Sequence, residues 1–216
     1  MNIIFVDKIL SPSVIRNKGI RVKESQIAIL VERARAGNHS SLEQLVSMFQ
    51  PEIFRMVYYR TRSRMDAEDL TQDIFINALK GLPKLKEVNS FKPWLFRIAV
   101  NRVRDFHRKK KILVFFRDEN DGDEFEQTES EIHENPQAIN HVIKEEFWQH
   151  ISRFAGKLGR LEREVFILRF LDQLSIKEIA RVLKKSESAV KTHLYRALGK
   201  FKNNPEIISR LKGETP

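Results

Sequence analysis

The sequence predicts an all-α protein made of two helical domains joined by an acidic flexible linker, the second of them a helix-turn-helix domain. Three observations lead to this prediction. Glycine and proline are sparse, with 8 and 7 residues among 216. Apolar residues recur with a period near 3.6 and rarely alternate, which favours helices over strands. The charge of the chain reverses abruptly after Lys111, between two stretches of helical pattern.

The amino-acid composition of the chain limits the kinds of ligand and partner that it can bind. A net charge of +10 favours a polyanion, either nucleic acid or an anionic membrane surface. The absence of cysteine excludes a disulfide framework, a thiolate zinc site and a thiol nucleophile. The histidines lack metal-binding spacing, so we expect neither a metal nor a cofactor.

No apolar run approaches the ~20 residues of a membrane span, and the start of the chain lacks the basic region of a signal peptide. We therefore expect a soluble, cytoplasmic protein without membrane insertion.

The first elements follow a basic leader, residues 1–23, which has no helical period and which we expect to be flexible. A helix is predicted over residues 24–36. Ser41 is predicted to cap a second helix, with Gln44 completing a capping box. Pro51 fits this region only as a kink or at the start of a further helix.

Two more helices complete the first domain. Asp66 opens one, which Gly81 ends as its C-cap. Another runs from Pro93 to about Lys110, with the proline at the first helical position. Short connections join these helices, so we predict one helical domain over residues 24–111.

An acidic linker is predicted next, over residues 112–144. Between residues 112 and 146 the only basic residues are Arg117 and Lys144. The acidic residues there are Asp118, Glu119, Asp121, Asp123, Glu124, Glu126, Glu129, Glu131, Glu134, Glu145 and Glu146. Such a composition cannot bury enough apolar surface to fold, and it predicts disorder in the middle of the linker.

The second domain is predicted over residues 145–204, followed by a tail at 205–216. Ser175 and Glu178 have capping-box spacing at the start of a short helix. After the turn at Lys184, Ser186 is predicted to cap a final helix. Two short helices, a tight turn and a basic second helix form a helix-turn-helix.

The outer face of the final helix carries polar donors. If Val190, Leu194 and Ala197 face the core, the opposite face follows from helical geometry. The residues on it are Ser188, Lys191, Thr192, Tyr195 and Arg196. These groups suit base edges and phosphates, on an element that fits a major groove. The alternative interpretation is a solvated helix hairpin without a ligand.

A second basic face is predicted on the helix that follows Phe91. Its members at helical spacing are Arg97, Asn101, Arg104 and Arg108. Such a face can follow phosphates, and the loop Lys86–Phe91 offers polar and aromatic groups beside it. Aromatic platforms next to a cationic groove suit single-stranded DNA. Phe91 and Trp94 fit equally well as core residues.

A stripe of carboxylates marks the helix that Asp66 opens. Asp66, Asp69 and Asp73 share one side of it, and apolar residues share the other. Clustered carboxylates suit a divalent metal or acid–base chemistry, but no second ligand set accompanies them. An acidic helix on a basic protein fits a basic protein partner better.

Three ordered motifs resemble extracytoplasmic-function (ECF) sigma factors of bacterial RNA polymerase. The first is Asp-Ala-Glu-Asp-Leu-Thr-Gln-Asp-Ile-Phe at 66–75, and the second is Phe-Lys-Pro-Trp-Leu-Phe-Arg-Ile-Ala-x-Asn at 91–101. The third combines Arg-Glu-Val-Phe-x-Leu-Arg at 163–169, Ile-Lys-Glu-Ile-Ala at 176–180 and Val-Lys at 190–191. The resemblance covers about residues 24–111 and 145–202.

The resemblance implies that the chain associates with core polymerase, recognises promoter DNA and promotes its melting, without catalysis of its own. The implied contacts to the β′ clamp coiled coil are Asp66, Glu68, Asp69, Gln72, Asp73 and Phe75. Those to the opened minus-ten strand are Lys86, Asn89, Ser90, Phe91, Trp94, Arg97, Asn101, Arg104 and Arg108. Those to the duplex minus-thirty-five element are Ser186, Ser188, Lys191, Thr192, His193, Tyr195 and Arg196. The second domain would also sit on the β flap, and the acidic linker would thread the polymerase cleft.

Two departures from the family pattern limit this transfer. Leu158-Gly159 replaces the usual Leu-Pro, so the entry of the following helix is expected to differ. His193 replaces an arginine, which removes a bidentate guanine contact.

The sequence leaves three other classes open. They are a one-component helix-turn-helix regulator that binds duplex DNA without the polymerase, a metal-dependent nuclease that uses Asp66, Asp69 and Asp73, and a protein adaptor. Whether an anti-sigma factor clamps the two domains is also left open.

Overall fold

A computed structural model describes residues 24–117 and 153–203, and the chain divides into two compact units that contain one range each. The first unit consists of α2 (Glu24–Arg35), α3 (His39–Thr61), α4 (Arg64–Gly81), two 3₁₀ turns (Leu82–Lys84 and Val88–Ser90) and α5 (Phe91–Arg117). The second contains α7 (Arg160–Phe170), α8 (Ile176–Leu183) and α9 (Glu187–Lys202). The described residues form no strand, which agrees with the predicted fold class. The predicted leader, most of the linker and the tail lie outside these residues.

The start of α3 differs from the prediction. Asn38 caps it, because its side-chain oxygen accepts a hydrogen bond from the Ser41 backbone N–H at 2.8 Å. Ser41 lies one turn inside and is only 3% exposed. Pro51 neither starts a helix nor ends one, since α3 continues through it. Phe49 and Ile53 are buried on either side of Pro51, so both halves of α3 pack into one core.

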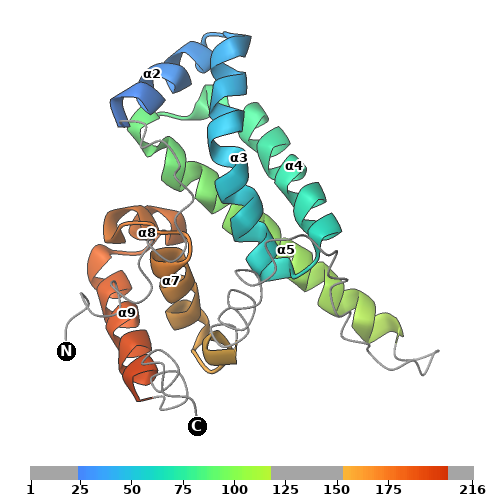
Figure 1. Ribbon diagram of the computed structural model, residues 1–216, viewed down its shortest axis with the longest axis vertical. Coiled ribbons are helices and arrows are strands. Elements are labelled where there is room, and N and C mark those ends of the chain that lie inside the picture. Colours follow the sequence, from blue (N-terminus) through green and yellow to red (C-terminus); the bar gives the residue numbers. More distant parts are fainter. Residues whose placement is uncertain (1–23, 118–152, 204–216) are drawn as a thin grey trace, which may run out of the picture. The chain divides into compact units, whose positions relative to one another are not determined.

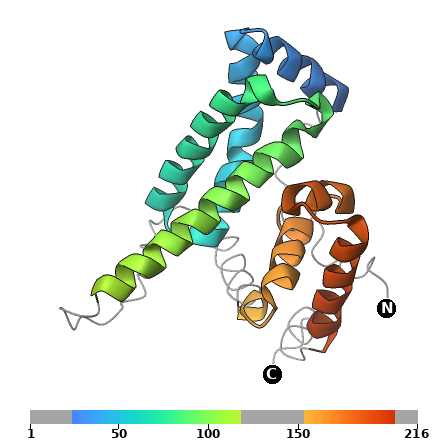
Figure 2. The ribbon, with the colours of Figure 1, turned by 180° about the vertical axis from the view of Figure 1, so that it is seen from behind.

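The first unit forms where α3 and α4 lie side by side and α5 crosses behind them (Figures 1 and 2). The inner face of α4 is apolar as predicted. It consists of Ala67, Leu70, Ile74 and Ala78, which are all at most 9% exposed. Ile53 and Met56 of α3 and Leu95 of α5 are fully buried. Burying a side chain of this size contributes about 1.5–3 kcal/mol.

Three contacts hold α5 along its length. Lys92 forms an ion pair with Glu52 of α3 at 3.0 Å. Trp94 packs on Gly81 so closely that a Cβ there would lie 3.0 Å from the indole ring. Further along, His107 Nε2 lies 3.0 Å from the Arg60 carbonyl oxygen. These contacts orient α5 relative to the two helices before it.

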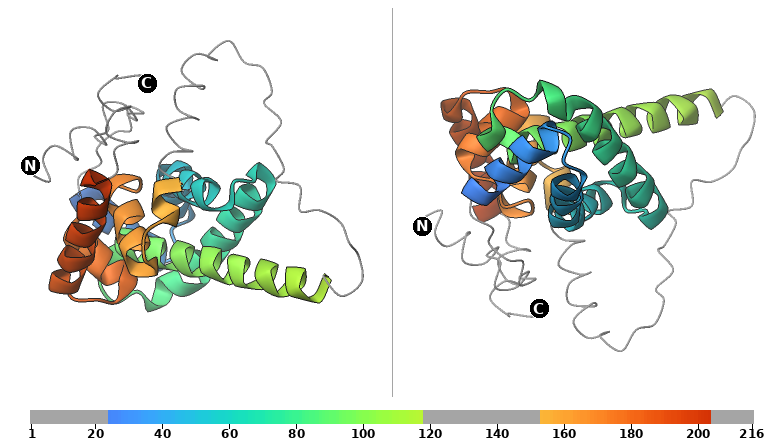
Figure 3. Two further views of the ribbon diagram at one scale, coloured as in Figure 1. Left: turned by 90° about the horizontal axis from the view of Figure 1, so that it is seen from below. Right: turned by 90° about the horizontal axis from the view of Figure 1, so that it is seen from above.

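The C-terminal part of α5 extends beyond α3 and α4 (Figure 3). The helix runs to Arg117, so residues 112–117, predicted as the start of the linker, are helical instead. The physical reason is local, because no acidic residue or helix breaker occurs between Lys111 and Asp118. The remaining predicted linker, residues 118–144, lies outside the described residues.

A cluster of phenylalanines forms the core of the second unit. Phe154 meets Phe166 and Phe201 edge-to-face, with ring centroids 5.3 Å and 5.2 Å apart. Phe166 also lies 4.9 Å from the ring of Phe170. Aromatic pairs at these distances stabilise beyond their buried area, by about 0.5–1.5 kcal/mol each. The cluster therefore joins α7, α9 and the helical turn at residues 153–156.

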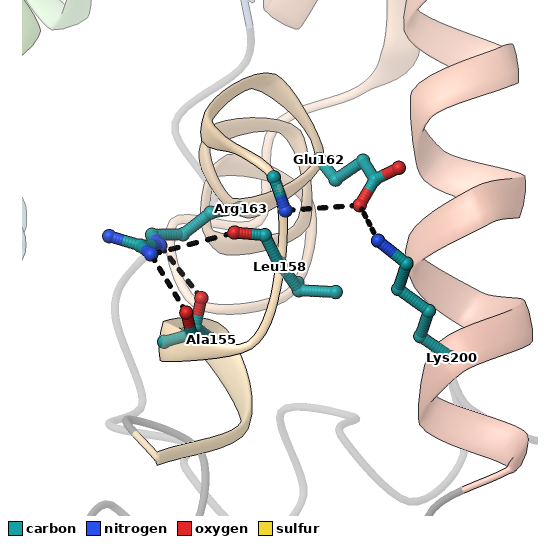
Figure 4. A network of polar contacts seen from close by, with 7 residues as sticks. Ala155, Leu158, Glu162, Arg163 and Lys200 are labelled. Carbon is teal, nitrogen blue, oxygen red and sulfur yellow. Dashed lines mark hydrogen bonds and ion pairs between the residues drawn. The ribbon is translucent and has the colours of Figure 1, made fainter.

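A polar network sets the entry of α7 (Figure 4). Glu162 accepts hydrogen bonds from the Gly159 backbone N–H at 3.1 Å and from Lys200 of α9 at 2.6 Å. Arg163 donates to the backbone oxygen atoms of Ala155 at 2.7 Å and Gly156 at 3.1 Å. The turn at Gly159 is thus held by side chains of α7 and α9.

The Glu162 carboxylate predicts a pH-dependent contribution to stability. The hydrogen bond from Lys200 lowers its pKa below the ordinary value of 4.5. A lowered pKa in the folded state stabilises above the unfolded pKa, and this contribution is lost as the pH falls through the folded value. We expect Glu162→Gln to increase hydrogen–deuterium exchange in α9 peptides at pH 7. The difference from the unmodified protein should shrink below about pH 4.5, and a constant difference across this range would contradict the assignment.

Candidate functional site

The outer face of α4 carries most of the predicted docking residues. Ser63 caps this helix and accepts from the Asp66 backbone N–H at 3.2 Å, so the helix begins two residues before the predicted start. Glu68, Asp69 and Gln72 are exposed and Asp66 is half-buried. Phe75 is only 8% exposed and packs in the core, so its predicted part in docking is not supported by an exposed side chain and stays a prediction.

Exposed apolar residues lie on the same face of α4. Met65 is 71% exposed, Ile76 40% and Leu79 38%. Together with Asp69 and Gln72 they recur at alternating spacings of four and three residues, which places them in one stripe along a helix. Sequence reasoning missed the three apolar members, although this spacing could have identified them. A stripe of apolar, acidic and amide side chains suits docking onto another helix.

Asp73 has a partner within the first unit. Its carboxylate forms an ion pair with Arg102 of α5, and both side chains are partly exposed. The pair joins the two helices that carry the predicted docking and single-strand faces. Asp73 therefore holds α4 on α5, and its role in docking stays a prediction.

The exposed side of α5 carries the predicted single-strand face. Asn101, Arg104 and Arg108 are exposed, and Arg97 is half-buried. Arg108 forms an exposed ion pair with Asp105 at 3.2 Å. These residues recur at helical spacing on the side away from the buried Ala99 and Val103, so their guanidinium and amide groups form one surface.

The loop before α5 and the two aromatic residues at the start of α5 differ in how far their side chains are exposed. Lys86 and Asn89 are exposed and Ser90 is half-buried. Phe91 is 4% exposed and packs edge-to-face on Phe49 at a centroid distance of 5.3 Å. It therefore packs in the core, and its assignment as a DNA contact stays a prediction. Trp94 is half-buried beside it, with ring centroids 5.8 Å apart.

The second unit forms the predicted helix-turn-helix from α8 and α9. The capping box at its start is confirmed, because Ser175 N–H donates to Glu178 at 2.7 Å and Glu178 N–H donates to Ser175 Oγ at 3.3 Å. Lys184 ends α8 in the left-handed conformation, with φ of 52°. Ser186 then caps α9 by accepting from the Ala189 N–H at 3.2 Å.

The outer face of α9 is the one expected from its apolar pattern. Its exposed members are Ser186, Ser188, Lys191, Thr192, Tyr195 and Arg196. Tyr195 stands out with 58% exposure. The Thr192 hydroxyl donates to the Ser188 carbonyl oxygen at 3.0 Å. His193 is half-buried, and its enclosed Nδ1 has no hydrogen-bond partner within the described residues.

Neither a metal site nor a membrane span is found in the described parts of the chain. Over residues 24–117 and 153–203, no three histidine, aspartate or glutamate side chains gather where they could hold a metal ion. Asp66, Asp69 and Asp73 thus form no cation cage. Within the same ranges, no helix combines the length and apolar character needed to cross a bilayer.

Both units of the chain match models of known protein families. Sigma-70 region 2 matches residues 45–112 and sigma-70 region 4 matches residues 151–201. The RNA polymerase sigma factor YlaC of Bacillus subtilis is 30% identical, over 77% of this chain and 93% of its own length. The ECF RNA polymerase sigma factor BldN of Streptomyces coelicolor is 31% identical, over 78% of this chain. The chain spans 62% of the length of BldN.

The chain belongs to the ECF sigma factors of the sigma-70 family.

Solved structures of sigma factors share the fold of this sigma factor. CnrH, in complex with the cytosolic domain of CnrY, matches with a TM-score of 0.60 at 23% identity, over 88% of this chain and 99% of that one. RpoE from Bartonella quintana, in complex with the anti-sigma factor NepR, has a TM-score of 0.54 at 18% identity, over 81% and 98%. By the family matches, region 2 of this sigma factor includes α4 and most of α5, and region 4 includes the helix-turn-helix.

The ion pair between Asp73 and Arg102 predicts energetic coupling between α4 and α5. Removing either side chain should destabilise region 2 by about 1 kcal/mol or less, because both groups are partly exposed to water. In a double-mutant cycle with Asp73→Ala and Arg102→Ala, the second substitution should cost almost nothing after the first. Thermal unfolding of the full chain measures this effect. Asp69→Ala is the control, and additive losses for Asp73 and Arg102 would show that the pair does not couple the helices.

Proposed function

We propose that this sigma factor binds core RNA polymerase, recognises the minus-thirty-five element as duplex DNA and holds the opened minus-ten element. One observation carries the proposal. Three chemically different surfaces lie on separate helices of the chain: the acidic and apolar stripe on α4, the basic face of α5 and the polar face of α9. A regulator that binds only duplex DNA leaves the first two without a role.

We assign docking on the core polymerase to the stripe on α4. Its residues are Met65, Asp69, Gln72, Ile76 and Leu79. The partner is the β′ clamp coiled coil, whose helical surface suits the spacing of these residues. Complementary charge accelerates encounter and fixes orientation, whereas apolar contacts supply most of the lasting affinity. Region 4 is assigned to the β flap.

Strand holding is assigned to α5 and the loop before it. Turning a base out of the stack costs a few kcal/mol, which a preformed cationic site must offset. Arg104 and Asn101 are exposed for contacts to phosphates and base edges, and Trp94 offers part of its ring for stacking. Because Lys92, Trp94 and His107 hold α5 in place, this surface is formed before DNA arrives.

An anti-sigma factor is a further proposed partner. RpoE of Bartonella quintana was solved with its anti-sigma factor NepR. In this chain the exposed apolar members of the α4 stripe offer a surface that such a protein could cover. Covering it would block docking on the polymerase, so the two partners would compete. The proposed site of action is the cytoplasm, where polymerase and promoter DNA meet, and no catalytic step is assigned to the chain.

Run-off transcription tests the function directly. Purified core polymerase is incubated with genomic promoter fragments, with and without the full chain. We expect specific transcripts only when the chain is present, because core polymerase alone does not select promoters. Tight duplex binding by the chain alone, without core-dependent initiation, would favour the one-component regulator. Magnesium-dependent cleavage of the fragments would favour the nuclease.

Charge reversal on α4 tests the docking surface. Asp69→Lys places a cation in the middle of the stripe, and we expect affinity for core polymerase to fall by at least about tenfold, or ~1.4 kcal/mol. The matched control is Glu43→Lys, which reverses an exposed carboxylate on α3. Binding is measured by fluorescence anisotropy of the labelled full chain, with circular dichroism to verify the fold. Equal affinities of the two variants would rule out this docking assignment.

A further inference from the structure

The stripe on α4 has the pattern by which two helices pack along each other. All its members are exposed, and α4 lies at one side of the first unit, next to α3 (Figure 1). Residues that alternate at spacings of four and three form the seam of a helix pair. Met65, Ile76 and Leu79 leave apolar surface in contact with water, and a second helix on this seam would bury that surface.

The stripe is centred on the helix that carries it. Because α4 runs from Arg64 to Gly81, Gln72 lies at its midpoint. Met65 and Leu79 lie at equal distances from Gln72 in the sequence, one on each side. A twofold axis through Gln72 would therefore lay the stripe of one copy antiparallel on that of another. Met65 of each copy would then lie opposite Leu79 of the other.

The charges beside the stripe fit the same arrangement. Asp66, Asp73 and Lys80 recur every seventh residue, so they follow one edge of the stripe. In an antiparallel pair this edge meets itself, which places Asp66 of each copy opposite Lys80 of the other. Asp66 is half-buried and Lys80 is exposed, and neither side chain forms an ion pair with a residue in 24–117 or 153–203. Both charges can therefore pair with the second copy.

The middle of this edge would bring two carboxylates together, since Asp73 would face Asp73 of the second copy. Like charges that face each other oppose association. The ion pair with Arg102 gives each Asp73 a compensating cation within its own chain. The contact that holds α4 on α5 thus offsets the charge that would oppose an antiparallel contact.

The parallel direction fits these residues less well. It would place Asp69 against Asp69 of the second copy within the seam, and it would set Glu68 beside Asp73. In the antiparallel direction Asp69 lies near Ile76 and Gln72 of the second copy instead. The Gln72 amide can donate a hydrogen bond to the Asp69 carboxylate. Charge therefore selects the antiparallel direction.

We infer that the free sigma factor self-associates through α4, in an antiparallel contact between two copies of the chain. Because the contact involves one face of one helix, it is small and reversible, with a dissociation constant on the order of 10–100 µM. The same stripe is proposed to dock on core polymerase. The dimer is thus a form that cannot dock, a consequence that rests on the proposed function, whereas the self-association does not.

Cysteine cross-linking tests the contact and its direction. The chain contains no cysteine, so each introduced thiol is unique. Met65 and Leu79 lie about 21 Å apart along the helix, whereas a disulfide requires Cα atoms within about 7 Å. Under mild oxidation of the full chain without polymerase, we expect Gln72→Cys to form a covalent dimer. Met65→Cys and Leu79→Cys should each stay largely monomeric alone and form a mixed dimer when combined.

The control for random collision is Ser47→Cys, which lies on the exposed side of α3. Its rate of covalent dimerisation should be well below that of Gln72→Cys, because position 47 lies outside the proposed contact.

Charge reversal tests the edge of the stripe, with sedimentation equilibrium of the full chain as the measurement. Lys80→Glu places a carboxylate opposite Asp66 at both ends of the contact, and we expect the dissociation constant to rise by about tenfold or more. Asp66→Lys/Lys80→Glu exchanges the two charges and should restore the constant to within about threefold. The matched control, Lys109→Glu, reverses an exposed lysine of α5 and should change the constant little. Circular dichroism verifies the fold of each variant.

Three results would overturn the inference. The first is a chain that sediments as a monomer at about 500 µM, well above the expected constant. The second is cross-linking of Gln72→Cys no faster than that of Ser47→Cys. The third is a covalent dimer of Met65→Cys alone that forms as readily as the mixed dimer, which would indicate the parallel direction.

The proposed function is judged by a separate measurement, because run-off transcription does not require self-association. Normal initiation by a chain that stays monomeric would remove the inference and leave the function. A chain that dimerises as expected but supports no initiation would leave the inference and remove the function.

Discussion

In region 2, α4 has one apolar face that is buried and one face that is exposed. The packing of the other helices of region 2 depends on this division. The inner face of α4 includes the small residues Ala67 and Ala78, which are buried together with Leu70 and Ile74. Small side chains allow helix axes to approach closely, so α3 and α5 pack against α4 on its inner side. Once this face is buried, the geometry of the helix directs Asp69 and its neighbours outward. The exposed stripe on α4 that we propose for docking is therefore a consequence of how the core is packed.

Region 4 depends on a different arrangement, in which short helices are stabilised mainly by their ends and by one aromatic cluster. A helix as short as α8 is marginal by itself, because nucleation is unfavourable and few hydrogen bonds follow it. Ser175 and Ser186 cap α8 and α9, and each such cap contributes about 1 kcal/mol. Phe166 and Phe201 hold α7 against α9. The exposed face of α9 is thus presented by a rigid support.

The sequence predicted interactions between residues close together in the chain, but it did not predict contacts between residues far apart in the chain. Capping by Ser175 and Ser186 was predictable because the partners lie three residues apart. The pair of Asp73 with Arg102 spans 29 residues, and no local pattern indicates that α5 crosses α4 at this point. Burial of Phe91 likewise depends on Phe49 of α3. Periodicity identified the faces of helices correctly, but which exposed residues have distant partners required the three-dimensional structure.

The net charge of the chain is a similar case, because it counts the charged residues but does not show where they lie or what they contact. The value of +10 indicates a polyanionic partner, but it does not reveal which cations are free to bind one. Lys200 is oriented by Glu162 and Arg163 by backbone carbonyl oxygens, so these side chains hold α7 in place. Lys177 and Lys185 have no such contacts among the described residues. Composition therefore predicts the kind of partner, whereas the structure shows which cations are engaged in holding the helices together.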